Sequence, residues 1–248
     1  RQDRDRGVDS GLRRDVCGRG SPPGRTLCLK RSPSVTFRAL LKNPEVATAL
    51  VGYFIGTIPS ADIATRMAAQ KGNDVKAIDL RETGTGNPGA SNAGQVLGAK
   101  WGAGVLLADI AKGAAASLIG RRAAGQLGAT IAATASVIGH CYPVWNGGKG
   151  GKGVAPSIGQ VLGTFPVYFP IDFAVAAATV AVPSLKDKAF VANSVASLAW
   201  VASSTLWWKK GWSTGWDDNA DASLPIGAMI SSAVIASKFV LNPIKRDN

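Results

Sequence analysis

Histidine, cysteine and charged residues are all scarce in this chain. Its 248 residues include one histidine and three cysteines, and only 18% of them are charged. The cysteines stand at Cys17, Cys28 and Cys141, with neither a C-x-x-C pair nor the spacing of a zinc site. We therefore expect free thiols, no metal site and no bound cofactor.

Charges are absent above all from a series of long stretches. Apolar residues make up 46% of the chain, and they gather in runs at residues 46–68, 96–120, 123–145, 153–165, 166–183, 189–208 and 224–241. A helix of about 20 residues crosses the roughly 30 Å core of a bilayer, so most of these runs are long enough. The sequence therefore predicts an all-α, polytopic membrane protein with about seven transmembrane helices. An alanine-rich soluble protein is the alternative.

The first 47 residues lack an aromatic side chain before Phe37 and lack the apolar core of a secretory signal. They contain eleven Lys and Arg and five acidic residues, and so carry half of the net charge of +12. We interpret residues 1–47 as a basic, disordered tail, 48–242 as the membrane domain and 243–248 as a C-terminal tail. Without interleaved aromatic residues the basic tail does not predict a nucleic-acid partner.

Most of the reactive side chains gather in a short stretch that follows the third apolar run. The single histidine, His140, precedes Lys149, Lys152 and five glycines between Gly147 and Gly153. Glycine backbone lets several N–H groups converge on an anion, and the lysines add positive charge. No Ser or Thr follows Lys152, so this is not the phosphate loop of nucleotide hydrolases. The stretch predicts an anion-binding site, with a flexible solvated loop as the alternative.

Two charged pairs interrupt the apolar runs. Asp62 and Arg66 lie four residues apart, and Asp109 and Lys112 lie three apart, so each pair shares a helical face. Charges inside a span are costly and indicate a functional site by default. The alternatives are a mutually neutralising pair and a lysine that reaches back to the interface. Pro59, close to the first pair, is expected to break its helix and free backbone groups that the protein must satisfy.

A second glycine-rich stretch runs from Gly84 to Asn92. It is dense in hydroxyl and amide side chains, which suit an oxyanion or polyol site without a metal. Two apolar runs separate it from the His140 stretch, so both should emerge on the same side of the membrane. Two consecutive turns are the alternative interpretation.

Four segments stand in order along the chain: GTIPSADIATR, DLRETGTGNPGASN, LLADIAKG and GHCYPVWNGGKGGKGVAPSIG. Between Val51 and Gly163 the chain thereby resembles the PlsY family, bacterial integral-membrane glycerol-3-phosphate acyltransferases that use acyl-phosphate. The resemblance implies seven transmembrane helices, glycine-rich loops in the cytoplasm and a location in the bacterial cell (inner) membrane. It also implies the first step of phospholipid synthesis: acyl-phosphate and sn-glycerol 3-phosphate give 1-acyl-glycerol 3-phosphate and phosphate. The partners are then the two substrates and the lipid bilayer, without a cofactor.

Position by position, the resemblance implies a set of site residues. The catalytic ones are His140, Thr57 and Asn87. The phosphate-binding ones are Arg66, Gly84, Gly86, Gly89, Asn92, Lys112, Lys149, Gly151 and Lys152. Both substrates are phosphates, so a cationic, amide-lined pocket could act mostly by positioning and electrostatic stabilisation. His140 could serve as general base or donate a hydrogen bond to phosphate, and the sequence does not separate these roles.

Several positions depart from the family pattern. Thr57 replaces a serine, Asp62 a neutral residue, Gln95 an arginine and Pro156 a threonine. The family's C-terminal Arg-His and later Glu are not evident around Lys238 to Lys245. A diverged, noncatalytic relative and a membrane transporter of phosphate-type anions are therefore the alternatives. The absence of a visible inverted repeat weighs against the transporter.

The distribution of Lys and Arg predicts the orientation. With loops 71–100, 145–153 and 183–189 and the C-terminus in the cytoplasm, ten basic residues lie inside and four outside, at Arg121, Arg122, Lys209 and Lys210. Residues 1–47 then lie outside, against the bias, and we give more weight to the loops. Cys141 should accordingly be shielded from an impermeant thiol reagent outside the cell.

Overall fold

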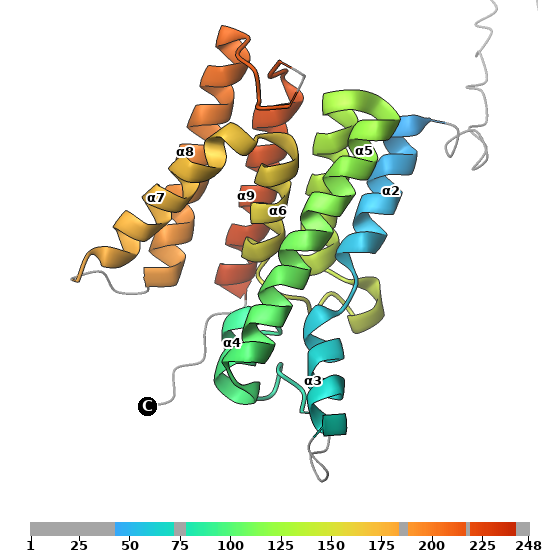
Figure 1. Ribbon diagram of the computed structural model, residues 1–248, viewed down its shortest axis with the longest axis vertical. Helices are drawn as coiled ribbons and strands as arrows, with labels where there is room; N and C mark the ends of the chain where they lie inside the picture. Colours follow the sequence, from blue (N-terminus) through green and yellow to red (C-terminus); the bar gives the residue numbers. More distant parts are fainter. Residues whose placement is uncertain (1–42, 72–77, 184–187, 217–218, 242–248) are drawn as a thin grey trace, which may run out of the picture. The chain divides into compact units, whose positions relative to one another are not determined.

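The computed structural model describes residues 43–71, 78–183, 188–216 and 219–241, and their regular structure is helical (Figure 1). The α-helices are α2 (Pro44–Gly56), α3 (Ser60–Lys71), α4 (Ala90–Leu97), α5 (Ala99–Cys141), α6 (Val154–Thr164), α7 (Phe169–Ala181), α8 (Lys188–Lys210) and α9 (Ser223–Leu241). Two short 3₁₀ turns, η1 (Val144–Asn146) and η2 (Pro166–Tyr168), join them. The predicted all-α class is confirmed.

Each of the predicted apolar runs contains a helix, but the runs do not all have the length of a membrane span. Among the described residues four helical segments are long and apolar enough to cross a bilayer, or five if α6 and α7 form one broken span. These two helices have 11 and 13 residues and meet at a bend of 119°. The chain is thus polytopic, and the number of seven crossings stays a prediction.

Helix α5 folds back on itself near its middle. Ala124 and Gly125 leave the helical region, and Gly125 has φ +57°, which glycine adopts at little cost. A β-carbon on Gly120 would collide with the carbonyl of Gly128, so the two halves run side by side. We call residues 99–123 the first half of α5 and 126–141 the second half. This reversal brings residues near the start of the helix close to residues at its end.

Close contacts between backbones hold the other helices against α5. Gly52 and Gly56 of α2 touch the backbone of its second half at Ala132 and Ser136. Gly159 of α6 lies equally close to Ile110 in the first half. Small residues permit this approach, which is how helices associate in lipid. The order α2, α5, α6 is therefore fixed by glycine at the contact points.

The helical region begins slightly earlier than predicted. Residues 44–47, which the sequence assigns to the tail, form the first turn of α2. The side chain of Asn43 caps it by accepting hydrogen bonds from the N–H groups of Glu45 and Val46, at 2.8 and 3.2 Å. The predictions for residues 1–42, including Cys17 and Cys28, and for 243–248 lie outside the described residues.

Helix α4 occupies part of the segment that the sequence interprets as loop 71–95. It begins after Gly89, and its apolar side chains Ala93, Val96 and Leu97 pack with Leu80 and with Trp101 at the start of α5. Gly98, with φ +99°, separates α4 from α5. Three apolar residues on one face pack this short helix against its neighbours. The helix is too short for hydrophobic periodicity to predict it from the sequence.

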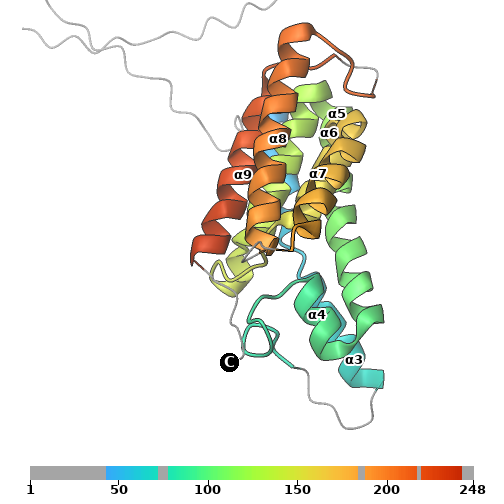
Figure 2. The ribbon, with the colours of Figure 1, turned by 90° about the vertical axis from the view of Figure 1, so that its left-hand side faces the viewer.

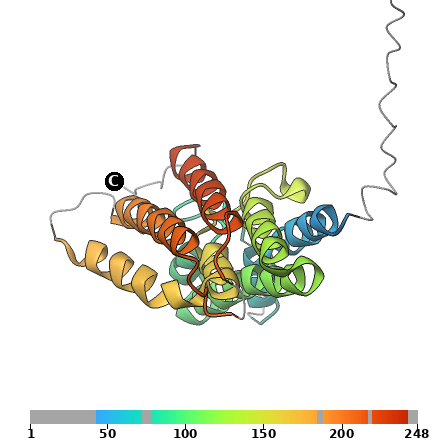
Figure 3. The same ribbon diagram turned by 90° about the horizontal axis from the view of Figure 1, so that it is seen from above.

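The two glycine-rich stretches lie together, as predicted. Figures 1 and 2 show α3, α4, the 142–153 segment and the end of α9 towards one end of the helices, and Figure 3 shows the helices from above. The carbonyl oxygen of Pro88 is 3.2 Å from where a β-carbon on Gly151 would stand. We call this end of the helices the loop side.

Labelling of Cys141 does not test the orientation, because its side chain is fully buried and would be shielded from a thiol reagent on either side of the membrane. Lys149 and Trp212 are exposed and stand at opposite ends of the helices. With Cys17 and Cys28 changed to serine, Lys149→Cys should react with an impermeant maleimide only in permeabilised cells, whereas Trp212→Cys should react in intact cells. The reverse pattern would place the loop side outside the cell.

Candidate active site

The break between α2 and α3 creates a binding position for a buried lysine. Residues 57–59 are not helical, as Pro59 predicts, and the carbonyl of Ile58 has no partner in a regular helical turn. The N–H of Ser60 donates a hydrogen bond of 3.0 Å to it, which leaves its second lone pair available. The Nζ atom of Lys112, in the first half of α5, donates a hydrogen bond of 3.0 Å to that carbonyl. The freed backbone group is thus satisfied inside the protein, as the sequence predicts.

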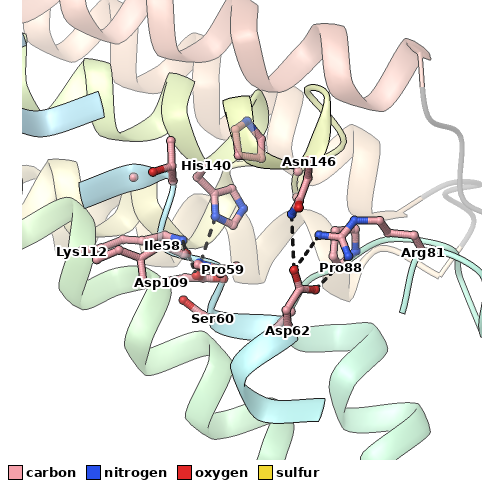
Figure 4. Close-up of a pocket in the computed structure, with 16 residues that line it drawn as sticks. Ile58, Pro59, Ser60, Asp62, Arg81, Pro88, Asp109, Lys112, His140 and Asn146 are labelled. Carbon is pink, nitrogen blue, oxygen red and sulfur yellow. Dashed lines mark hydrogen bonds and ion pairs between the residues drawn. The ribbon is translucent and has the colours of Figure 1, made fainter. Parts of the chain in front are cut away.

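Three ionisable side chains meet beside this break (Figure 4). Lys112 Nζ lies 2.8 Å from Asp109 Oδ1, and Nδ1 of His140 lies 3.6 Å from the same oxygen. The exposed fractions of these residues are 6% for Lys112, 2% for Asp109 and 8% for His140. Burying charges is costly unless they are paired, so the cluster has to be held together by the fold. The sequence places Asp109 beside Lys112, but only the reversal of α5 adds His140.

Lys152 is a second buried cation, and no acidic side chain of the described segments pairs with it. Only 9% of it is exposed, and its Nζ has no hydrogen-bond partner among the described residues. It lies 4.3 Å from the centre of the Phe239 ring. Burial lowers the pKa of Lys152 below its ordinary value, because desolvation disfavours the charged form. An anion at this position would restore a partner to the ammonium group.

The stretch Gly84–Asn92 is organised by Asn92. Its amide donates to the carbonyls of Leu80 and Thr83, both at 2.8 Å, and its oxygen accepts from Thr85 N–H at 2.9 Å. Asn92 is fully buried, and a β-carbon on Gly84 would collide with its amide oxygen. The predicted binding residues Asn92 and Gly84 thus shape the loop, and the amide that faces a cavity is that of Asn87.

Arg81 contributes an arginine that the sequence analysis does not assign. Its guanidinium pairs with both oxygens of Asp62, at 2.8 and 3.1 Å, and its Nε donates to the carbonyl of Lys149 at 2.9 Å. Asn146 donates to the same carboxylate at 3.3 Å. Hydrogen bonding to Asp62 raises the pKa of Arg81 above its ordinary value. The sequence left open a mutually neutralising pair of Asp62 and Arg66, whereas the structure gives Asp62 a bidentate partner in Arg81.

Two hollows border the cluster. The small pocket, of about 30 Å³, lies between the α2–α3 break and the loops, and Thr57, Asp62, Arg81, Lys112 and Gly151 contribute to its wall. The loop-side cavity, of about 570 Å³, lies between α4, α5 and α6. Its lining includes Thr85, Asn87, Gly89, Ser91, Lys152 and Phe239. Asp109 and His140 line both hollows, so His140 stands where they meet.

The remaining predicted residues divide between the site and the surface. Thr57 is buried and donates to the carbonyl of Phe54 at 2.7 Å. Gly151 lies against the imidazole of His140, whereas the Lys149 side chain is exposed. Gly86 occupies a turn with φ +73°. Arg66 is exposed on α3 and lines none of the described cavities, so the structure does not bring it to the other predicted residues.

A further cation reaches the loop from α9. Lys238 is 2% exposed, donates to the carbonyl of Gly148 at 3.3 Å and lies 4.8 Å from the centre of the Tyr142 ring. The sequence analysis finds no counterpart of the family's C-terminal residues here. A lysine within an apolar run is the signal that would have singled it out.

The fold and this site define a class: a polytopic helical membrane protein whose glycine-rich loops close on buried cations. Within that class the chain belongs to the glycerol-3-phosphate acyltransferase family, whose model matches residues 46–242.

Curated relatives agree with this assignment. The chain is 37% identical over 150 residues to the glycerol-3-phosphate acyltransferase of Thermoanaerobacter pseudethanolicus, covering 60% of this chain and 72% of the relative. It is 43% identical over 134 residues to that of Chlorobaculum tepidum, covering 49% of this chain and about half (55%) of the relative.

Solved structures agree as well. Two crystal structures of PlsY (YgiH), an integral membrane glycerol 3-phosphate acyltransferase, are similar to this chain at 25% sequence identity. The glycerol 3-phosphate form has a TM-score of 0.58 and covers 82% of this chain and 96% of its own. The lysophosphatidic acid form has a TM-score of 0.59 and covers 82% and 95%.

The contact between Gly151 and His140 makes a specific prediction. A β-carbon on Gly151 would collide with Nε2 of His140, whereas one on Gly104, on the first half of α5, would meet nothing within 4 Å. Gly151→Ala should displace the imidazole and lower the acyltransferase activity, by about 10²-fold on the scale of a misplaced catalytic group. Gly104→Ala should leave the activity close to that of the unchanged protein, as measured by product formation in detergent. Equal activity of the two variants would mean that the position of His140 does not matter.

Proposed function

We propose that this protein transfers an acyl group from acyl-phosphate to sn-glycerol 3-phosphate, giving 1-acyl-glycerol 3-phosphate and inorganic phosphate. The observation that carries the site assignment is the position of His140 between two hollows, each bordered by a buried cation. Two phosphate-bearing substrates need two cationic positions and a reactive group between them. This arrangement supplies both.

In the proposed reaction a hydroxyl oxygen of glycerol 3-phosphate attacks the carbonyl carbon of acyl-phosphate. The new carbon–oxygen bond forms as the bond from the carbonyl carbon to the phosphate oxygen breaks, and phosphate leaves. The hydroxyl proton passes to His140 or to the departing phosphate. Phosphate is a good leaving group, so positioning and electrostatic stabilisation supply the acceleration without a covalent enzyme intermediate.

We assign the phosphate of the acyl donor to Lys152, because this buried cation is without a hydrogen-bond partner in the described part of the chain. The amide of Asn87 lines the same cavity. Glycerol 3-phosphate is assigned to the small pocket, where Arg81 and Lys112 line the wall. Each of these cations forms an ion pair, Arg81 with Asp62 and Lys112 with Asp109. A substrate phosphate would replace part of these ion pairs. The pocket of about 30 Å³ has to widen for this, which requires movement of the loop that carries Arg81.

We further propose that the protein resides in the bacterial inner membrane with its loop side facing the cytoplasm. The polytopic fold supports the membrane, and the excess of Lys and Arg in loops on that side supports the orientation. Glycerol 3-phosphate is a charged solute, and a loop-side site would meet it directly from the cytosol.

The activity can be tested with the purified full chain. Incubated with an acyl-phosphate and glycerol 3-phosphate, it should form 1-acyl-glycerol 3-phosphate, detected by mass spectrometry. Lys112→Ala and Lys152→Ala should each lower kcat/KM by about 10²- to 10³-fold, the usual effect of losing one preorganised group at a reacting charge. Lys100→Ala, at an exposed position outside the predicted site, is the matched control. A folded protein without any product would identify a noncatalytic relative.

The pH dependence follows from Lys152. Desolvation lowers the pKa of the free Lys152 ammonium, and a bound phosphate favours its charged form. Lys152 therefore loses its charge, and acyl-phosphate its partner, as the pH rises through the lowered pKa. KM for acyl-phosphate should therefore rise with pH already below the ordinary lysine pKa of about 10.4. Lys152→Arg keeps its charge and should flatten this rise, whereas Lys149→Arg should not; identical profiles for the two variants would contradict the assignment.

A further inference from the structure

A second cavity, which the proposed reaction does not use, adjoins the loop-side cavity. We call it the inner cavity. It has a volume of about 280 Å³ and lies between α6, α7, α8 and α9. Its lining shares Val154, Ile158, Ala189 and Phe239 with the loop-side cavity. These four residues stand where the two hollows adjoin, and we call them the neck.

Three helices, α6, α8 and α9, line both hollows, and they indicate the same direction for a path from the loop-side cavity into the inner cavity. On α6 the shared residues are Val154 and Ile158, and the residues found only in the inner cavity are Ser157 and Val161, of which Val161 extends farthest along the helix. On α8 the path leads from Ala189 to Trp200, about 16 Å at 1.5 Å per residue. It therefore starts beside Lys152 and leads away from the loop side.

The neck is apolar, whereas polar side chains line the rest of the inner cavity, with Ser157 and Asn193 closer to the neck. The far end differs by a buried indole and a carboxylate. Trp200 is 5% exposed, and its indole Nε1 has no hydrogen-bond partner among the described residues. Asp172 and Ser197 line the same cavity. Antiparallel pairing of α7 and α8 through residues 182–187 places Asp172 opposite this part of α8. A methylene group pushed against these polar groups would strip them of water without replacing it, which is unfavourable.

We propose that the inner cavity receives the acyl chain of the donor and that Trp200, with Asp172, limits the chain length. This inference rests on the proposed function. The charge of Lys152 favours an acyl-phosphate as the occupant. When its phosphate pairs with Lys152, its hydrocarbon chain lies at the apolar neck. The chain then passes the apolar neck into the inner cavity, and its methyl end stops at the indole of Trp200 and the carboxylate of Asp172.

A competing position exists on the other side of the first half of α5. This outer groove, of about 710 Å³, is lined by Ile63, Met67, Trp101, Gly104 and other apolar residues of α2, α3 and α5. The cation it touches is Lys112, which is already bonded to Asp109 and to the carbonyl of Ile58. The inner cavity is favoured because its neck lies in the same hollow as Lys152, which has no hydrogen-bond partner in the described part of the chain.

The first test compares the two positions with matched substitutions. Ala189 is exposed and Gly104 has open space beside it, so Ala189→Phe narrows the neck and Gly104→Phe fills the outer groove without disturbing the fold. With a series of acyl-phosphates, Ala189→Phe should lower kcat/KM for long chains relative to short ones by at least about ten-fold, the discrimination available to an apolar pocket. Gly104→Phe should leave this ratio unchanged. The opposite result would place the chain in the outer groove and overturn the inference.

The polar far end is tested by Trp200→Ala and Asp172→Leu, which should each shift the preference towards longer chains. Trp200 belongs to a buried apolar cluster, so thermal unfolding is followed in parallel. Trp208→Ala, at a partly exposed position on the same helix, is the control for loss of a tryptophan. Unchanged chain preference in folded Trp200→Ala and Asp172→Leu would overturn the length limit.

A readout independent of turnover separates this inference from the proposed function. Lysophosphatidate with a photoreactive diazirine at the end of its chain should crosslink to α7 or α8 near Trp200, as located by peptide mapping. Crosslinks to Met67 or Trp101 would overturn the inference even in an active enzyme. Crosslinks near Trp200 in a protein that makes no product would refute the proposed acyl transfer and leave the chain position supported.

Discussion

The break between α2 and α3 determines how the site is held, because it exposes a backbone carbonyl inside the helical part of the protein. A proline interrupts the helix, and the carbonyl of Ile58 is left to be satisfied by something other than its own helix. The N–H of Ser60 and the ammonium of Lys112 both donate to it, and Asp109 in turn compensates the charge of Lys112. The buried ion pair thus helps to compensate for the backbone hydrogen bond that is lost at the break. Because Lys112 links the α2–α3 break to the first half of α5, this contact also fixes one wall of the site.

Glycine makes the second constraint possible. The reversal of α5 at Gly125 and the contacts of Gly52, Gly56 and Gly159 bring helices close enough for backbones to touch. At this separation Asp109 and His140, from opposite ends of one helix, come within 3.6 Å. The chemistry depends on these close approaches, since a bundle with bulkier contacts would hold the imidazole and the carboxylate apart.

The departures from the family pattern are accommodated by local partners. Asp62 would be an uncompensated acid near a phosphate site, but Arg81 engages both of its oxygens. Thr57 replaces a serine and keeps a hydroxyl that bonds to the carbonyl of Phe54. Pro156 is buried beside Gly113, whose missing side chain makes room for it. The buried cations keep their arrangement despite these three substitutions, which supports an active enzyme over a noncatalytic relative.

The sequence by itself determined the helical membrane class, the glycine-rich loops and most of the charged residues of the site, because apolar run length and charges inside such runs are local properties of the chain. Pro59 and the pair Asp109 and Lys112 could be predicted for the same reason. The sequence did not determine the partner of Asp62, since a spacing of four residues favoured Arg66, whereas the loop that carries Arg81 lies closer in space. Nor did it show that Lys152 has no hydrogen-bond partner among the described residues, or that Lys238 donates to the carbonyl of Gly148. These contacts depend on which helices pack together. Only the tertiary structure decides the packing, because the glycine contacts that fix it join residues far apart in the sequence.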